Sequence, residues 1–182
     1  MNRKYLAAAL LTGSLAACGA TTPIHPADVP LPTASPVAVH TANGWPVPDQ
    51  KLTPGVVLTT DKTKVCRPGY SASVRKVSGA TKTAAYAEYG VKTHKSYQYE
   101  VDHLLPLELG GSNDLANLWP EPADRPYGAN SKDLLENEMH KQVCAGKVTL
   151  ADAQQQILTS WVDAWPKYMP TPLGAFFPAT RL

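Results

Sequence analysis

The stretch that decides the fold is residues 99–119, Tyr-Glu-Val-Asp-His-Leu-Leu-Pro-Leu-Glu-Leu-Gly-Gly-Ser-Asn-Asp-Leu-Ala-Asn-Leu-Trp. Its beginning alternates weakly and is rich in aromatic and branched residues, which is typical of a strand over Tyr97–Leu105. The segment 110–114, Gly-Gly-Ser-Asn-Asp, indicates a turn, and a second strand at Leu118–Trp119 should end at Pro120. A helix should follow from about Asn130 or Ser131 to Val143, with Leu135, Met139 and Val143 on one apolar stripe. The pattern therefore predicts a small α+β domain built round a ββα hairpin-plus-helix unit.

Asp102 and His103 are the residues of this stretch that can carry chemistry. Neighbouring side chains of a strand point to opposite faces. Asp102 can therefore bind a hard divalent cation through oxygen, while His103 takes a proton from water. A neutral imidazole suits that task near pH 7, and the cation would polarise a scissile phosphate. Asn117 has an amide that can hold His103 in one tautomer.

These residues resemble the first two elements of the HNH endonuclease motif: Asp102–His103, the proline three residues later, the double glycine and Asn117. The span from Cys66 to about Trp165 resembles more closely a set of exported bacterial HNH-like proteins. The shared segments are Cys-x-Pro-Gly, Tyr-x-x-Tyr-Gly, Asp-His-Leu, Leu-Glu-Leu-Gly-Gly, Asn-Leu-Trp-Pro-Glu-Pro and Lys-Asp-x-x-Glu-Asn-x-x-His-x-x-Val-Cys. The resemblance implies a ββα-metal nuclease that uses a divalent ion, Mg²⁺ before Mn²⁺, Ni²⁺ or Zn²⁺. Its substrate would be nucleic acid, DNA before RNA.

The resemblance implies one role for each matching residue. Asp102 would be a metal ligand, His103 the general base and Asn117 the residue that orients this histidine. The third element departs from the pattern, because Arg125 stands where the family places its last histidine.

The following helix offers replacements on one face, where these residues recur at helical spacing: Asp133, Glu136, Asn137, His140 and Cys144. We expect Glu136 and His140 as metal ligands, with Asp133 or Asn137 as alternatives. His140 can instead pack or cap the end of the helix, where a positive charge is favoured.

The charge distribution leaves two interpretations open. The formal net charge is +2, and loss of Arg3 and Lys4 with a signal peptide would leave 15 basic and 15 acidic residues. That balance argues against a broadly basic coat for nucleic acid. Residues 61–98 hold eight basic side chains and residues 99–139 hold nine acidic ones, which fits a phosphate-binding surface beside a cation site or two solvated faces. The candidates for phosphate binding are Arg67, Arg75 and Lys132, and each can also be an ordinary surface residue.

The N-terminus has the order of a bacterial lipoprotein signal. Arg3 and Lys4 precede the short apolar run Tyr5–Leu15, and Leu-Ala-Ala-Cys-Gly at 15–19 resembles a lipobox. We therefore expect a signal peptide at 1–17, a lipid on Cys18, and a monomer anchored to the outer membrane that faces the periplasm or the cell surface. Ordinary cleavage nearby is the alternative. With Cys18 lipidated, Cys66 and Cys144 can form a disulfide in an oxidising compartment, or remain two buried thiols.

The rest of the chain divides by composition. Residues 18–51 are rich in Pro, Thr, Ala and Val without periodicity, which is typical of an extended tether. We expect the HNH-like domain over 52–169 and a tail over 170–182. Other expected elements are a strand at Val56–Leu58, strand or irregular chain over Ser71–Val77, and a helix over Lys82–Tyr89. A last helix should run over Leu150–Trp165, begin with a Thr149/Asp152 capping box and end at Pro166.

The sequence as a whole therefore predicts a metal-dependent HNH-type endonuclease. The alternative is a non-catalytic binding or structural lipoprotein with an HNH-like fold. The near-neutral charge and the missing third histidine favour that alternative.

Overall fold

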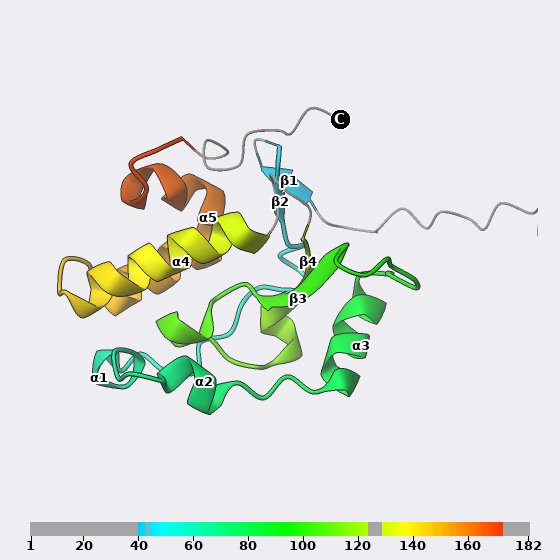
Figure 1. The fold of residues 1–182 in the computed structure, drawn as a ribbon, viewed down its shortest axis with the longest axis horizontal. Helices are drawn as coiled ribbons and strands as arrows, with labels where there is room; N and C mark the ends of the chain where they lie inside the picture. Colours follow the sequence, from blue (N-terminus) through cyan, green and yellow to red (C-terminus); the bar gives the residue numbers. More distant parts are fainter. Residues whose placement is uncertain (1–39, 43, 124–128, 173–182) are drawn as a thin grey trace, which may run out of the picture. The chain divides into compact units, whose positions relative to one another are not determined.

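The computed structural model describes residues 40–42, 44–123 and 129–172 (Figure 1). The helices are α1 (Lys62–Val65), α2 (Tyr70–Val74), α3 (Gly79–Glu88), α4 (Ala129–Cys144) and α5 (Leu150–Tyr168). The strands are β1 (His40–Ala42), β2 (Trp45–Val47), β3 (Tyr99–His103) and β4 (Leu118–Pro122), paired as β1–β2 and β3–β4. This mixture confirms the predicted α+β class. The predicted signal peptide, Cys18, Arg125 and the tail from residue 173 lie outside the described residues.

The hairpin predicted from residues 99–119 is present as β3 and β4. The strands are antiparallel, with Asp102 opposite Trp119 and His103 opposite Leu118. β4 continues past Pro120, where we expected it to end. Both strands of this sheet are edges, so a proline nitrogen that faces away from the partner strand removes no ladder hydrogen bond.

A buried amide closes the connection between β3 and β4. Asn117 donates through Nδ2 to the carbonyl oxygens of Leu105 (2.9 Å) and Ser112 (2.8 Å). Its Oδ1 accepts from the backbone N–H groups of Leu105 (2.9 Å) and Val56 (3.3 Å). A Cβ at Gly111 would lie 1.8 Å from the Leu105 carbonyl oxygen, so only glycine allows the chain to pass this closely.

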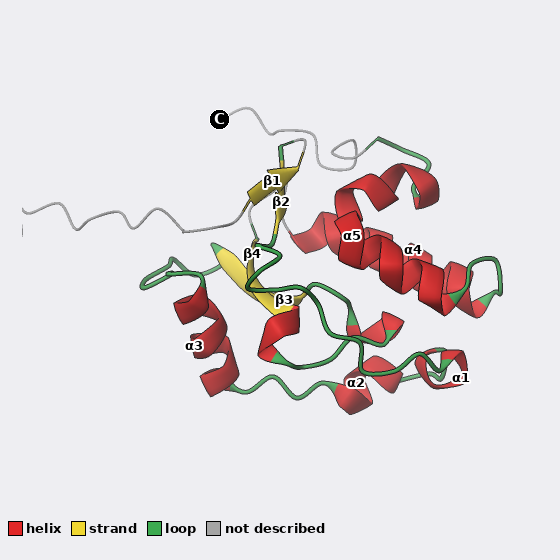
Figure 2. Cartoon of the chain, turned by 180° about the vertical axis from the view of Figure 1, so that it is seen from behind, coloured by secondary structure: helices red, strands yellow, loops and turns green. Residues whose placement is uncertain are grey.

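Helices α4 and α5 lie side by side and contribute most of the largest hydrophobic cluster (Figure 2). The predicted stripe of Leu135, Met139 and Val143 on α4 is fully buried. It belongs to the same core cluster as Ile157 and Trp161 of α5. The 3.6-residue period of the apolar positions therefore identified the buried face of each helix correctly.

The boundaries of α5 differ from the prediction at its C-terminal end. Thr149 caps the helix as expected, because its Oγ1 accepts from the Asp152 N–H at 3.0 Å. Pro166 does not end the helix, which continues to Tyr168. The backbone is extended at Ser160, so the last part of α5 is a separate helical segment that includes Pro166 and continues to Tyr168.

The predicted boundary of the tether is wrong. β1 and β2 form a hairpin inside the range 18–51. Trp45 is buried and meets the ring of Trp161 edge-on, with ring centroids 6.0 Å apart. The Trp161 indole N–H also donates to the Pro46 carbonyl at 3.2 Å. One buried aromatic ring attaches this segment to α5, and a single ring produces no periodicity that a sequence pattern could reveal.

Two other local predictions were wrong. The segment from Ser71, expected as strand or irregular chain, contains helix α2, and the expected strand at Val56–Leu58 is reduced to an isolated bridge between Val57 and Gly111.

The predicted disulfide is confirmed: Cys66 and Cys144 are bonded, with Cα atoms 5.5 Å apart. It joins the end of α1 to the end of α4. None of the helices within 40–123 and 129–172 is long and apolar enough to cross a membrane.

Reduction of the disulfide should lower the free energy of unfolding by about 4 kcal/mol, because the bond closes a loop of 78 residues. Urea unfolding with and without a phosphine reductant measures the change. The double variant Cys66→Ser/Cys144→Ser is the control and should not respond to reductant. Equal stability of the oxidised and reduced chain would contradict this account of the link between α1 and α4.

Candidate functional site

The side chain of Lys132 on α4 reaches the hairpin and is fully buried there. Its Nζ donates to Asp102 Oδ2 at 2.7 Å, to the His103 carbonyl oxygen at 2.7 Å, and to Glu136 Oε1. Glu121 Oε2 lies 3.8 Å from the same nitrogen. We call these four side chains, of Asp102, Glu121, Lys132 and Glu136, the lysine cage. One ammonium group therefore uses all three of its N–H donors on oxygen atoms.

Simple periodicities bring the lysine cage together. Lys132 and Glu136 are four residues apart on α4 and so share a face of the helix. Asp102 lies opposite Trp119 in the hairpin, and Glu121 is two residues beyond Trp119, so Asp102 and Glu121 share a face of the sheet. The helix face and the sheet face meet at the ammonium.

The lysine cage does not carry three full negative charges. Burial disfavours the charged form of Lys132, but the carboxylates of Asp102, Glu136 and Glu121 outweigh it and raise the lysine pKa well above its usual value. Burial also acts against ionised Asp102, but Lys132 outweighs it and lowers the pKa of that carboxyl. For Glu121 and Glu136 burial dominates and raises the pKa well above the usual range. The pair Lys132–Asp102 therefore carries the charge, as expected where unpaired buried charge is costly.

Glu121 is the least satisfied member of the lysine cage. It is fully buried, and neither of its carboxyl oxygens accepts a hydrogen bond from a donor among the described residues. Burial raises its pKa well above the usual value, and the neighbouring carboxylates of Asp102 and Glu136 add to this shift.

His103 points away from the lysine cage and is held by Asn113. The His103 Nε2 lies 3.3 Å from Asn113 Oδ1. Two backbone contacts fix the orientation of that amide: its Nδ2 donates to the Val74 carbonyl at 2.8 Å, and its Oδ1 accepts from the Lys76 N–H at 3.1 Å. Because Oδ1 can only accept, Nε2 must carry the proton and Nδ1 must have the lone pair.

The predicted role of Asn117 is wrong. We expected its amide to orient His103, but all of its hydrogen bonds go to backbone groups. Asn113 takes the orienting role. It lies in the segment that the sequence indicated only as a turn, and its partner groups on Val74 and Lys76 are 39 and 37 residues away in the chain.

The neutral form of His103 is favoured by its surroundings. Burial lowers the pKa of His103, although Asp102 acts in the opposite direction, and the charge of Arg75 adds to the lowering. His103 Nδ1 is 3.9 Å from Asp102 Oδ1, too far for an Nδ1–H group to donate a hydrogen bond to that carboxylate, so this contact does not hold a proton on Nδ1. The imidazole is thus a base held in one tautomer.

His140 does not join Asp102. Its Nε2 lies 3.0 Å from the Val65 carbonyl oxygen and 3.4 Å from Cys144 Sγ, beside the disulfide. Ligand atoms of Cys66, His140 and Cys144 lie within 4.8 Å of one another, so this group has the geometry of a possible metal site. The two sulfurs are bonded to each other, which removes the thiolates that such a site needs. Of the expected helix ligands, only Glu136 converges with Asp102. The alternatives Asp133 and Asn137 are exposed.

A divalent cation does not fit the lysine cage as it stands. Carboxylates such as Asp102, Glu121 and Glu136 are the ligands that Mg²⁺ prefers. The point where they converge is filled by the Lys132 ammonium, which is hydrogen-bonded to Asp102 and Glu136 and fully buried. Two cations would not share this small volume, because their repulsion in a buried site is strong.

The three predicted phosphate-binding residues have different positions. The prediction for Lys132 is wrong, because its ammonium is buried and its donors are used. Arg75 is exposed and close enough to His103 to affect its pKa, so it can meet an anion beside the base. Arg67 is also exposed, and nothing in the described part of the chain connects it with His103.

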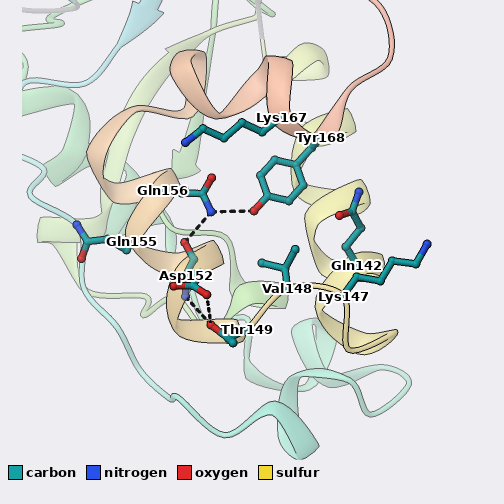
Figure 3. A pocket seen from close by; sticks show the side chains of 9 residues that line it. All are labelled: Gln142, Lys147, Val148, Thr149, Asp152, Gln155, Gln156, Lys167 and Tyr168. Carbon is teal, nitrogen blue, oxygen red and sulfur yellow. Dashed lines mark hydrogen bonds between the residues drawn. The ribbon is translucent and has the colours of Figure 1, made fainter.

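A polar pocket between the end of α4 and α5 is separate from these residues (Figure 3). Gln156 donates there to the Tyr168 hydroxyl at 2.9 Å. None of the predicted site residues lines this pocket. We therefore assign it no part in the candidate site.

Comparisons of the chain with protein-family models, curated proteins and solved structures found no significant match. The resemblance to HNH endonucleases therefore stays a prediction from the sequence.

Removing the Asn113 amide should release the tautomer of His103. In Asn113→Ala we expect both neutral tautomers of His103 in side-chain ¹⁵N NMR, where the native chain has the proton on Nε2. Asn137→Ala is the control, because that exposed amide only bonds the Asp133 carbonyl of its own helix. A native chain with the proton on His103 Nδ1 would contradict the assignment.

Loss of the Asn117 amide should instead weaken the fold. Asn117→Ala leaves buried backbone groups without partners, at about 1–3 kcal/mol each, so we expect at least about 3 kcal/mol less stability. Urea unfolding measures it. A change as small as that of Asn137→Ala would show that the connection between β3 and β4 does not depend on this amide.

Proposed function

We propose that this protein is an HNH-type hydrolase of nucleic-acid phosphodiesters, with DNA as the preferred substrate and His103 as the general base. The observation that carries the proposal is the state of His103. Asn113 holds the Nε2 proton, burial favours the neutral ring, and Nδ1 is left to accept a proton.

Each residue beside the base has a part in the proposed reaction. His103 Nδ1 removes a proton from water, and the resulting hydroxide attacks the phosphorus. The bond from the phosphorus to one sugar oxygen breaks, and this leaving oxygen takes up a proton from solvent. Arg75, exposed near His103, binds the negative phosphate oxygens. Asp102 and Lys132 anchor β3 to α4, so that the backbone of His103 is fixed from the opposite side by the bond from Lys132 to its carbonyl oxygen. No step of this mechanism passes through a divalent ion.

The proposal includes the location of the protein. The lipobox-like segment at 15–19 supports a lipid anchor on Cys18 and a monomer at the outer membrane, in contact with the periplasm or the cell surface. The disulfide between Cys66 and Cys144 is consistent with an oxidising compartment.

A non-catalytic HNH-like protein is the second candidate, and two observations favour it. Only 2% of the His103 surface is exposed, so water and substrate have little access to the ring in this conformation. Acidic residues also lie around the site: the pKa values of Glu100, Glu108 and Asp133 are raised, first by partial desolvation of their carboxyl groups and then by neighbouring carboxylates. An acidic surrounding repels the phosphates of a nucleic acid.

Cleavage of plasmid and single-stranded DNA by the purified protein tests the proposal. His103→Ala should reduce the rate by roughly 10²–10⁴-fold, the usual contribution of a general base. His94→Ala is the matched control, because that histidine is exposed and stacks on Tyr86 away from the base. Equal rates for the native chain and His103→Ala, in EDTA and with Mg²⁺, Mn²⁺, Ni²⁺ or Zn²⁺, would favour the non-catalytic candidate.

The pH dependence of cleavage should report the same histidine. The pKa of His103 is lowered by burial, so the ring stays neutral to a pH below its usual value of 6.5. The value of kcat/KM should therefore be constant from pH 8 down to about 6.5 and fall only below that. A profile that already falls between pH 8 and 7 would indicate a different base.

A further inference from the structure

The most unusual feature of the molecule is a fully buried lysine among three acidic side chains. Lys132 is 0% exposed, and so is Glu121. Buried lysines are rare unless they are paired, and here the pairing is complete: three N–H donors meet three oxygens. The ammonium occupies the position from which a bound cation would contact both the hairpin and α4.

The oxygen atoms around this position are more numerous than an ammonium can use. Asp102, Glu136 and the His103 carbonyl take the three donors, and the carboxyl group of Glu121 remains without a donor although it is completely buried 3.8 Å from Nζ. A divalent ion accepts six or more oxygen ligands and would use this fourth group. The lysine cage therefore has the oxygen ligands of a divalent-metal site, but the cation that it holds is the ammonium group of Lys132.

We propose that the Lys132 ammonium is the resident cation of this site, so that the native chain binds no divalent ion at Asp102, and that removal of the ammonium converts the lysine cage into a divalent-cation site. The inference deepens the proposed function, since it specifies that the charge beside Asp102 comes from the protein itself. Because Lys132 is buried and its donors are used, it positions Asp102 and the His103 backbone and does not touch substrate.

Titration of the full chain with Mn²⁺, followed by calorimetry and by the paramagnetic spectrum of free Mn²⁺, tests the first part. We expect no stoichiometric binding by the native protein that depends on Asp102, and the same melting temperature in EDTA and in millimolar Mg²⁺. Stoichiometric Mn²⁺ binding that is lost in an Asp102→Asn variant with the circular dichroism spectrum of the native chain would overturn the proposal.

Lys132→Ala tests the second part, because it removes the ammonium and leaves space between the carboxylates. This variant should melt well below the native chain in EDTA, recover by several degrees in Mn²⁺, and bind one Mn²⁺. Lys132→Met is the matched control: it removes the charge but fills the space with an apolar side chain, so Mn²⁺ should not restore it. Lys132→Ala/Glu136→Gln should bind Mn²⁺ at least about tenfold more weakly, as expected when a metal ligand is lost. A folded Lys132→Ala that binds no Mn²⁺ would overturn this part.

These measurements separate the inference from the proposed function. If the native chain cleaves no DNA and binds no Mn²⁺, while Lys132→Ala gains a site, the proposed function fails and the inference stands. If the native chain cleaves DNA only with a divalent ion that binds at Asp102, the inference and the metal-free mechanism fail, whereas nucleic-acid hydrolysis with His103 as the general base stands.

Discussion

The salt bridge between Lys132 and Asp102 connects the two parts of the molecule on which the site depends. It ties α4, which belongs to the main apolar core, to the short hairpin β3–β4, which two strands alone would hold only weakly. Loss of one partner from a buried charge pair typically costs about 3–5 kcal/mol, because the other charge stays buried and unpaired. The hairpin is therefore positioned by apolar packing of Val101, Leu118 and Trp119 beside α3 and by this electrostatic contact with α4, rather than by an extended sheet.

Strand alternation then separates two kinds of chemistry that are adjacent in the sequence. Asp102 faces α4 and is committed to an ammonium, whereas His103 faces Asn113 and the chain after α2. The Lys132 bond to the His103 carbonyl links the two sides, since one ammonium fixes both the carboxylate and the backbone of the base. Lys132, a single residue of helix α4, thus fixes the backbone position from which the His103 side chain extends.

Residues close in sequence or related by a regular period were predictable, and contacts between distant segments were not. The hairpin, the buried stripe of α4 and the disulfide followed from alternation, helical spacing and a count of cysteines. The role of Asn113 was not predicted, because its partners Val74 and Lys76 come from another part of the chain. The burial of Lys132 was not predicted for a different reason. A lysine on a helix is normally solvated, and only the position of Glu121 on β4 reveals that this lysine is buried among acidic side chains. The buried ring of Trp45 gave no periodic signal either.

A covalently attached cation changes what the site can do. A bound Mg²⁺ exchanges water and substrate oxygens among its ligands, whereas the Lys132 ammonium has three donors and all are used within the protein. It can hold the hairpin and balance Asp102, but it cannot polarise a phosphate that it does not reach. The charge that binds a phosphate must then come from the surface, where Arg75 is the cation whose field reaches His103 most directly. Any hydrolysis at this site would therefore depend on a base and an arginine, which is a smaller set of groups than a metal-dependent nuclease uses.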